Sequence, residues 1–392
     1  MLKYIILTLD ASLFGKMFSA LRFYQIEEMI MNWQSAVKRK SSSLFLTYFL
    51  AAISLSMLTP STANAEEDRF AGLIAPLKAE KPFKLAVTVV HLNDDFYKGI
   101  IYGITDEAKR SGVNVVQVSV AGAYGNVREQ FAQLEAFKSI GADVAVLAPA
   151  AYNGFDPIIK SLKASGMKVA SVGIPVDSNN IDFGVLQDDT YIGKLMAEAV
   201  CHSAVKPKNV AMIPGPAGAE WVRLRYVGFK EEAKKCPTPI SVVETGFGGG
   251  IDLQEGLTKA ADLMLRNPEV NFIYTPQITL GMGAVQAIRQ QHRQASVVSS
   301  AMVKRVVPMI EEGKMLAVVS EPGIIMGRLI VQYAIRSMEG KPLPNLAAAG
   351  TDGLNYAHLN VPNKVLDKDN VATHPFETYE IAPADWKVPA MQ

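Results

Sequence analysis

The sequence predicts an α/β protein of two doubly wound lobes, each built on a parallel sheet, joined by a hinge of several strands. Two observations lead to this fold class. From residue 84 onward, short apolar runs alternate with amphipathic segments of helical length, as in chains built from β-α-β units. The apolar runs show little in–out alternation, which is typical of strands covered on both faces.

The elements of the first lobe follow in a regular order. Strands are expected at 84–90, 113–120, 144–148 and 168–172, with helices at 95–111, 126–140 and 156–165. Gly112, Gly141 and Gly166 stand at the ends of these helices, where glycine commonly takes up the left-handed conformation that stops a helix.

The same alternation restarts at residue 209. Strands are expected at 209–213, 240–245, 272–274, 296–299 and 316–319. Two sheets of about five strands suit this length better than one sheet of ten. The chain is expected to cross between lobes at 183–189 and 316–320. The predicted parts are an N-terminal extension with signal peptide (1–65), a linker (66–83), an N-terminal lobe (84–186 plus 323–339), a C-terminal lobe (187–322) and an irregular tail over the hinge (340–392).

The first 65 residues have the pattern of a secretory signal peptide. The basic run 38–40 precedes an apolar run at 44–58, and Ala63-Asn64-Ala65 is a small-x-small cleavage signature. The apolar run is short for a membrane span, which needs about 20 residues, so cleavage after Ala65 is favoured over a retained anchor. Met31 would begin a leader of ordinary length, and a true N-terminal extension is the alternative. The mature chain is expected in the periplasm.

Composition and motifs argue against several classes of function. The formal net charge is +1, which gives no reason to expect a nucleic acid as partner. The five histidines are scattered, so no metal site is expected. The glycine run 246–250 lacks the spacing and lysine of a phosphate-binding loop. No cofactor and no catalytic activity are expected.

Two cysteines are present, Cys201 and Cys236. Both fall near the ends of helices that flank the strand at 209–213, and these helix ends lie at one edge of the sheet. In an oxidising compartment we expect them to form a disulfide. The alternative is two small buried side chains.

The turn after the strand at 209–213 is the most informative local feature. Gly215, Pro216 and Gly218 lead the chain sharply into a helix expected at 221–235. Trp221 and Arg223 therefore fall in the first turn of a helix at the carboxyl edge of a parallel sheet, where open α/β sheets hold their ligands. An aromatic residue there predicts the wall of a binding site.

Taken in order along the chain, several segments resemble the type I periplasmic binding-protein family, from about residue 84 to 340. They include the aromatic start of a helix at 96–99, the Gly-Ala-Asp run at 141–143, the segments 187–193 and 215–229, and the runs 267–270 and 312–314. The resemblance implies the two-lobe fold with a small-molecule ligand in the cleft.

Within this family the chain looks most like periplasmic sensors of trimethylamine N-oxide, which act with a membrane histidine kinase. The run 215–221, Tyr124, the pair Phe96 and Tyr97, and the segment 274–278 with Gln277 carry this likeness.

The sugar-binding branch differs at several positions. Its Asp-Arg pair is replaced here by the turn 173–175, its Asn by Gln277, its later carboxylate by Ala301, and a crossover Gln by Ser320. Arg223 matches the sugar branch.

The resemblance implies an aromatic site for a methylated amine. Phe96, Tyr97, Tyr124 and Trp221 would surround the methyl groups, because cations bind aromatic faces. Three further residues are expected in the same site, and each has an alternative role. Arg223 would donate to the ligand or pair with a surface carboxylate, and Tyr152 would line the cleft or lie in a loop. Asp189 would face a cationic group, fix a neighbouring donor, or cap a helix.

Two functions follow as expectations. The first is a periplasmic sensor that binds trimethylamine N-oxide or a similar methylated amine and signals to a histidine kinase. The alternative is a binding protein that delivers a sugar or other small polar solute to an ABC permease. A cytoplasmic regulator of the same fold is disfavoured by the leader.

Overall fold

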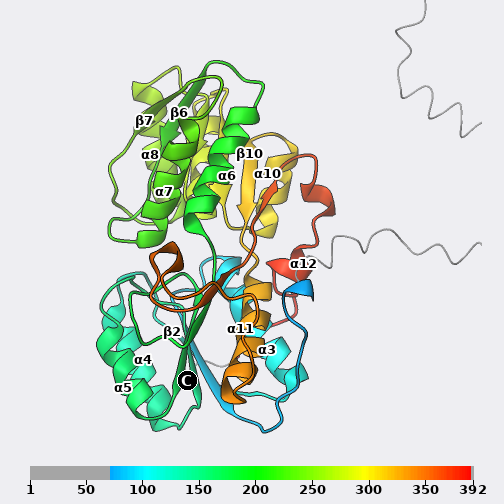
Figure 1. Cartoon of the computed structure of the whole chain (residues 1–392). Helices are drawn as coiled ribbons and strands as arrows, with labels where there is room; N and C mark the ends of the chain where they lie inside the picture. The colour runs from blue at the N-terminus through cyan, green and yellow to red at the C-terminus, as the bar shows by residue number, and fades with distance from the viewer. Residues whose placement is uncertain (1–70, 390–392) are drawn as a thin grey trace, which may run out of the picture. The chain divides into compact units, whose positions relative to one another are not determined.

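The structure, a computed structural model, describes residues 71–389 (Figure 1). The predicted leader, its cleavage site and the start at Met31 lie outside the described residues. Within the described range no helix is long and apolar enough to span a membrane.

The first lobe is built on a six-stranded sheet in which all neighbouring strands are parallel. Its order is β11-β5-β4-β3-β1-β2. The strands are β1 (Lys84–Val89), β2 (Asn114–Val120), β3 (Val144–Leu147), β4 (Lys168–Gly173), β5 (Phe183–Leu186) and β11 (His358–Asn360). The helices are α3 (Asp95–Ser111), α4 (Val127–Ser139), α5 (Asp156–Ala164) and α11 (Gly323–Met338).

The second lobe repeats this plan in the order β12-β10-β9-β8-β6-β7. Its strands are β6 (Lys208–Met212), β7 (Ile240–Glu244), β8 (Phe272–Tyr274), β9 (Ser296–Ser300), β10 (Met315–Ser320) and β12 (Lys364–Leu366). Its helices are α6 (Asp189–His202), α7 (Glu220–Ala233), α8 (Leu253–Arg266), α9 (Ile278–Gln290) and α10 (Val307–Glu311). In both sheets the chain winds outward on each side of its first strands, which confirms the predicted fold class.

Helix α11 follows the second sheet in sequence but packs in the first lobe, beside α3 (Figure 1). Gly103 and Gly327 permit this close approach, because a Cβ on either residue would collide with the backbone of the other helix. The segment before β1, expected as a linker, also lies against α11. There Gln332 accepts a hydrogen bond from the backbone N–H of Leu77 at 2.8 Å, and Arg336 donates to the carbonyl of Ala75 at 2.6 Å.

Helices α6 and α7 approach each other in the same way in the second lobe. A Cβ on Gly193 would collide with the backbone of Arg225, and one on Gly228 would collide with the backbone of Thr190. This contact places the start of α6 against the middle of α7. Near their C-terminal ends, Cys201 and Cys236 form a disulfide with a Cα–Cα distance of 5.6 Å.

The tail is more ordered than the irregular chain expected after residue 340. Strand β11 pairs parallel with β5, and β12 pairs antiparallel with β10, so the tail adds an edge strand to each sheet. The short helices η4 (Thr351–Gly353), η5 (Val371–Thr373) and α12 (Phe376–Tyr379) complete it, beside η2 (Ala71–Leu73) and η3 (Lys304–Val306) elsewhere in the chain. Strands of three residues are too short for hydrophobic periodicity to reveal.

The tail is anchored where β10 passes toward α11. The carboxylate of Glu380 accepts a hydrogen bond from the Ser320 hydroxyl, and Nε2 of His374 lies 2.8 Å from Oε2 of the same carboxylate. Asn363 donates to the carbonyl of Ser320 at 2.9 Å. His374, Glu380 and Ser320 are all buried, so we call these three residues the tail anchor.

Replacing Glu380 by Ala should lower the free energy of unfolding by about 2–3 kcal/mol. The change leaves the Ser320 hydroxyl and His374 buried without their acceptor, and a lost hydrogen bond to a charged group costs about that amount. Denaturant unfolding of the purified protein measures it. Glu377→Ala, at an exposed position of the same helix, is the control and should change stability by less than about 0.5 kcal/mol. Equal losses in the two variants would contradict the anchor.

Candidate functional site

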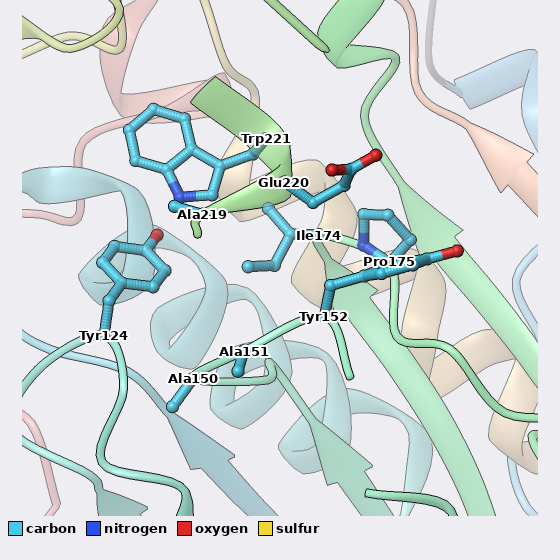
Figure 2. Close-up of a pocket in the computed structure, with 9 residues that line it drawn as sticks. All are labelled: Tyr124, Ala150, Ala151, Tyr152, Ile174, Pro175, Ala219, Glu220 and Trp221. Carbon is cyan, nitrogen blue, oxygen red and sulfur yellow. The ribbon is translucent and has the colours of Figure 1, made fainter. Parts of the chain in front are cut away.

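The carboxyl ends of the strands from both lobes face each other across two adjoining pockets, each with a cavity volume of about 20 Å³. Open α/β sheets bind ligands at this edge. The first, the apolar pocket, is lined by Tyr124, Ala150, Ala151, Tyr152, Ile174, Pro175, Ala219, Glu220 and Trp221 (Figure 2). The second, the polar pocket, is lined by His91, Asp94, Phe96, Tyr97, Tyr124, Ile174, Gln187, Trp221, Arg225, Ile251, Gln277, Ala301 and Glu321.

The four aromatic residues singled out in the sequence all line the polar pocket. The hydroxyls of Tyr97 and Tyr124 lie 3.0 Å apart. The ring of Tyr124, from the first lobe, lies 5.6 Å from that of Trp221, from the second, and Figure 2 shows the two facing each other. Phe96 packs at 5.1 Å from Tyr97. Contact of these rings with a ligand remains a prediction.

Trp221 lines both pockets, as Tyr124 and Ile174 do. It is 5% exposed and packs with Ile174 and Val222. Its indole Nε1 is buried and has no hydrogen-bond partner among the described residues. A buried unpaired donor is costly, so this atom is suited to a ligand oxygen.

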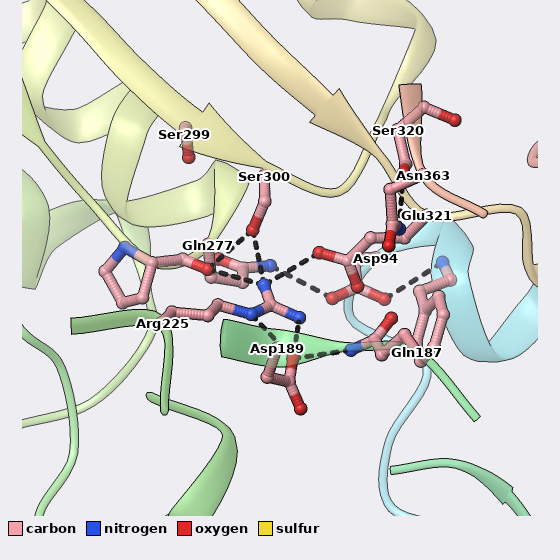
Figure 3. Close-up of polar contacts among 12 residues, drawn as sticks. Asp94, Gln187, Asp189, Arg225, Gln277, Ser299, Ser300, Ser320, Glu321 and Asn363 are labelled. Atoms are coloured by element: carbon pink, nitrogen blue, oxygen red, sulfur yellow. Dashed lines mark hydrogen bonds and ion pairs between the residues drawn. The ribbon is translucent and has the colours of Figure 1, made fainter. Parts of the chain in front are cut away.

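Arg225 is the centre of the polar contacts in Figure 3. Its guanidinium lies 2.8 Å from Asp189 and 2.7 Å from Glu321, and it donates to the carbonyl of Pro276 at 2.8 Å. It also donates to the Ser300 hydroxyl. The side chain is 2% exposed. One cation thus joins α7 to α6, to the segment after β8, to the last residue of β9, and to the crossover after β10.

The guanidinium of Arg225 also lies against Trp221, with Cζ 4.8 Å from the ring centroid. The two residues are four apart in α7, so they share one face of that helix. A cation at this distance attracts the face of the indole ring. One face of Trp221 is therefore occupied by the protein itself.

Arg223, the arginine predicted to touch the ligand, lines neither pocket. Its half-exposed side chain pairs with Glu220, and its Nε donates to that carboxylate at 2.8 Å. A step of two residues on a helix turns a side chain by about 200°, so Arg223 and Arg225 point in nearly opposite directions. This pairing matches the alternative given for Arg223, whereas Arg225 lines the polar pocket. Contact of Arg223 with a ligand remains a prediction.

Asp189 is buried behind the polar pocket, where it neither lines the cavity nor caps the helix. The cap of α6 is Asp188, which accepts a hydrogen bond from the backbone N–H of Tyr191 at 2.8 Å. Asp189 holds Arg225, and it also accepts from Nε2 of Gln187 at 3.0 Å. Of the roles expected for Asp189, this geometry matches the one in which it fixes a neighbouring donor, here Arg225.

A direct hydrogen bond joins the two lobes across the polar pocket. Nε2 of Gln277, at the start of α9, donates to Oδ2 of Asp94 at 3.0 Å. Both residues also cap helices, since Asp94 accepts from the N–H of Phe96 at 3.1 Å and Gln277 accepts from the N–H of Thr279 at 2.7 Å. These caps fix the side chains in place for the contact between the lobes.

Tyr152 lies in the apolar pocket, half-buried, with Glu220 across from it (Figure 2). Burial and the nearby Asp177 raise the pKa of its phenol. The position of Tyr152 favours the cleft over an unrelated loop, and its contact with ligand remains a prediction.

Burial shifts the pKa values of several side chains in the site. It lowers the pKa of His91, an effect that Asp94 partly offsets, and it raises the pKa values of Tyr97 and Tyr124. Burial, opposed by Arg225 and reinforced by Glu321, raises the pKa of Asp189 to about 7. For Arg225 burial acts to lower the pKa, but Glu321 and Asp189 outweigh it and raise the value, so this cation stays charged.

Sequence reasoning missed five polar residues of the site: His91, Asp94, Gln187, Arg225 and Glu321. Three of them carried a usable signal. Asp94 stands before a predicted helix as a cap, Arg225 is one turn beyond Trp221, and Glu321 follows the predicted crossover strand. Ile174 and Ala301, noted as departures from the sugar-binding branch, do line the polar pocket, whereas Ser320 lines neither pocket.

No group of His, Cys, Asp and Glu side chains suited to holding a metal ion occurs in residues 71–389. The polar pocket brings hydrogen-bond donors and acceptors together. Its chemistry is that of a binding site for a small polar molecule.

Comparisons with known proteins agree with this geometry. A family model described as a periplasmic binding protein domain matches residues 85–342. A solved structure from Bordetella parapertussis, titled a sugar ABC transport system substrate-binding protein, is 54% identical with a TM-score of 0.79, and the match covers 82% of this chain and 100% of that one.

Two curated relatives are more distant. The ribose import binding protein RbsB of Bacillus subtilis is 23% identical over 270 residues, covering 69% of this chain and 86% of that protein. The periplasmic protein TorT of Escherichia coli is 26% identical over 269 residues, covering 68% of this chain and 76% of that protein. The likeness to TorT is thus weak beside the 54% identity of the Bordetella protein.

Replacing each of the two arginines of α7 in turn by leucine compares the contributions of the buried and the exposed cation to stability. Arg225→Leu should destabilise the fold by about 3–5 kcal/mol, because it leaves Asp189 and Glu321 buried without their cation. Arg223→Leu is the matched control on the same helix and should cost at most about 1 kcal/mol, as expected for an exposed ion pair. Denaturant unfolding compares them, and similar losses would show that Arg225 does not hold the site together.

Asp189 should make stability depend on pH in a particular direction. Its pKa is about 7 in the folded protein but about 4 in an unfolded chain, so its contribution is present below about pH 4 and is lost as the pH rises through about 7. Between pH 5 and pH 8 the wild type should lose about 2–3 kcal/mol of unfolding free energy from this group. Asp189→Asn should lack that loss. Parallel stability curves for the two proteins would contradict the raised pKa.

Proposed function

The chain belongs to the periplasmic binding protein domain family, a ligand-binding rather than a catalytic family, and on that premise we propose that it binds a small hydroxylated solute such as a sugar. Binding takes place in the cleft between the lobes, in the periplasm, and the solute is then delivered to an ABC permease. The 54% identical Bordetella protein, with its printed role in sugar transport, supports this proposal.

The observation that carries the proposal is a buried donor and a buried acceptor without partners in one pocket. Trp221 offers its indole N–H, and Gln187 offers its side-chain carbonyl oxygen, which is also unpaired among the described residues. A hydroxyl group both accepts and donates, so a polyol satisfies both atoms. Trimethylamine N-oxide has no hydrogen to donate and would leave Gln187 unpaired.

The sequence comparison had counted the sugar-binding partners of this cleft as mostly lost. The departures were counted at the turn 173–175, Gln277, Ala301 and Ser320, and of these Ile174, Gln277 and Ala301 do line the polar pocket. Arg225 and Glu321, which were not counted, line it as well. With Asp94 and Gln187, the polar pocket has a set of side chains able to hold hydroxyl groups. The polar side of the site therefore favours the sugar-like alternative.

A methylated amine sensed on behalf of a histidine kinase remains the second candidate. The rings of Tyr97, Tyr124 and Trp221 around the pocket favour it, as does the 26% identity to TorT. Against it, Arg225 already covers one face of Trp221, so the indole has one face left for a second cation.

Calorimetric titration of the purified protein distinguishes the two candidates. Ribose and allose represent the first class, and trimethylamine N-oxide and betaine the second. We expect heat of binding from at least one sugar and none from the methylated amines at the same concentrations. Binding of the N-oxide with no response to sugars would reverse the order of the two candidates.

Trp221→Ala should weaken binding of the responding ligand at least tenfold. The change removes the indole donor and a buried ring that both pockets share, and burying a large side chain is worth about 1.5–3 kcal/mol. Tyr191→Ala, at an exposed aromatic residue outside both pockets, is the control and should keep full affinity. If Trp221→Ala binds the ligand as tightly as the wild type, Trp221 does not contribute to the binding site.

A further inference from the structure

Asp94 is a buried carboxylate in the polar pocket that has no cationic partner. It is 4% exposed, and its two oxygens accept hydrogen bonds from neutral donors, the N–H of Phe96 at 3.1 Å and the amide of Gln277 at 3.0 Å. No lysine, arginine or histidine of residues 71–389 forms an ion pair with it. Buried charges are ordinarily paired, so this carboxylate calls for an explanation.

The other charges around the pocket do not neutralise Asp94. The one guanidinium, Arg225, is already shared by Asp189 and Glu321. Burial lowers the pKa of His91, which favours its neutral form. The positive end of the α3 dipole offsets part of the charge on Asp94, because this residue caps that helix. Asp94 and Glu321, together with the partly ionised Asp189 behind them, outweigh the one full cation and leave excess negative charge at the pocket.

The carboxylate still has room for another donor. Ionised oxygens offer about four acceptor positions in all, and two on Asp94 are occupied. The same pocket contains the unpaired carbonyl oxygen of Gln187 and the unpaired N–H of Trp221, both on side chains at most 5% exposed. These three groups line one cavity.

We infer that the ligand is a hydroxylated amine bound in its protonated form, with its ammonium group at Asp94 and a hydroxyl group between Gln187 and Trp221. This inference rests on the proposed function and narrows its substrate class from polyols in general to cationic ones. The ammonium supplies the missing counter-ion, and the hydroxyl satisfies the buried acceptor and the buried donor. The charge of Asp94 then selects between ligands of similar shape.

Matched pairs of ligands test the charge directly. In one pair D-glucosamine is compared with D-glucose, and in the other tris(hydroxymethyl)aminomethane is compared with its neutral analogue pentaerythritol. Calorimetry at pH 7 should give at least tenfold tighter binding for the amine in a pair that binds. Asp94→Asn keeps the shape and the helix cap but gives up the acceptor of Gln277, and should reduce that preference to about twofold or less. Asp95→Asn is the control, because Asp95 pairs with Lys98 and lines neither pocket.

A second measurement needs no ligand. An unpaired buried carboxylate destabilises the empty protein, so Asp94→Asn should unfold at a higher temperature than the wild type, whereas Asp95→Asn should not. Gln277→Ala removes the same hydrogen bond between the lobes and leaves the charge in place. An unfolding temperature for Asp94→Asn below that of Gln277→Ala would mean that the charge stabilises the fold, and would overturn the inference.

The outcomes distinguish a failure of this inference from a failure of the proposed function on which it rests. If glucose and pentaerythritol, or ribose and allose, bind as tightly as the amines, the proposed function stands and the charge selection is wrong. If no sugar, polyol or hydroxylated amine binds the wild type, both fail together.

Discussion

The buried guanidinium of Arg225 is the interaction on which the site depends. It joins two helices of the second lobe, the segment after one of its strands, the last residue of another, and the crossover that leads to the first lobe. A charge of this kind costs several kcal/mol to bury and is tolerated because two carboxylates and a carbonyl surround it. The same side chain lies on Trp221, so the network also orients the aromatic wall of the cleft.

Close helix packing makes this network possible. Gly193 and Gly228 bring α6 and α7 together, and that contact places Asp189 beside Arg225. On the other lobe, Asp94 caps α3 and meets Gln277, which caps α9. Close helix packing and helix capping thus hold polar side chains in fixed orientations where the two lobes meet.

Several parts of the molecule follow from sequence pattern. The alternation of apolar and amphipathic segments predicts both sheets, because covered strands and helices differ in period and length. The aromatic residues Phe96, Tyr97, Tyr124 and Trp221 were predicted at the carboxyl ends of strands and line one pocket. The strands of the tail were not predicted, since their pairing with distant partners decides whether three residues form a strand.

The sequence by itself determined the fold class, the edge of the sheets that holds the cleft, and the aromatic side of the site. The tertiary structure decided the polar side: that Arg225 and not Arg223 faces inward, that Asp189 serves an internal cation, and that Asp94 is left without one. The physical reason is that the position at which a strand ends depends on residues close together in the sequence. The pairing of charges depends instead on groups tens to hundreds of residues apart, brought together when the helices and lobes pack.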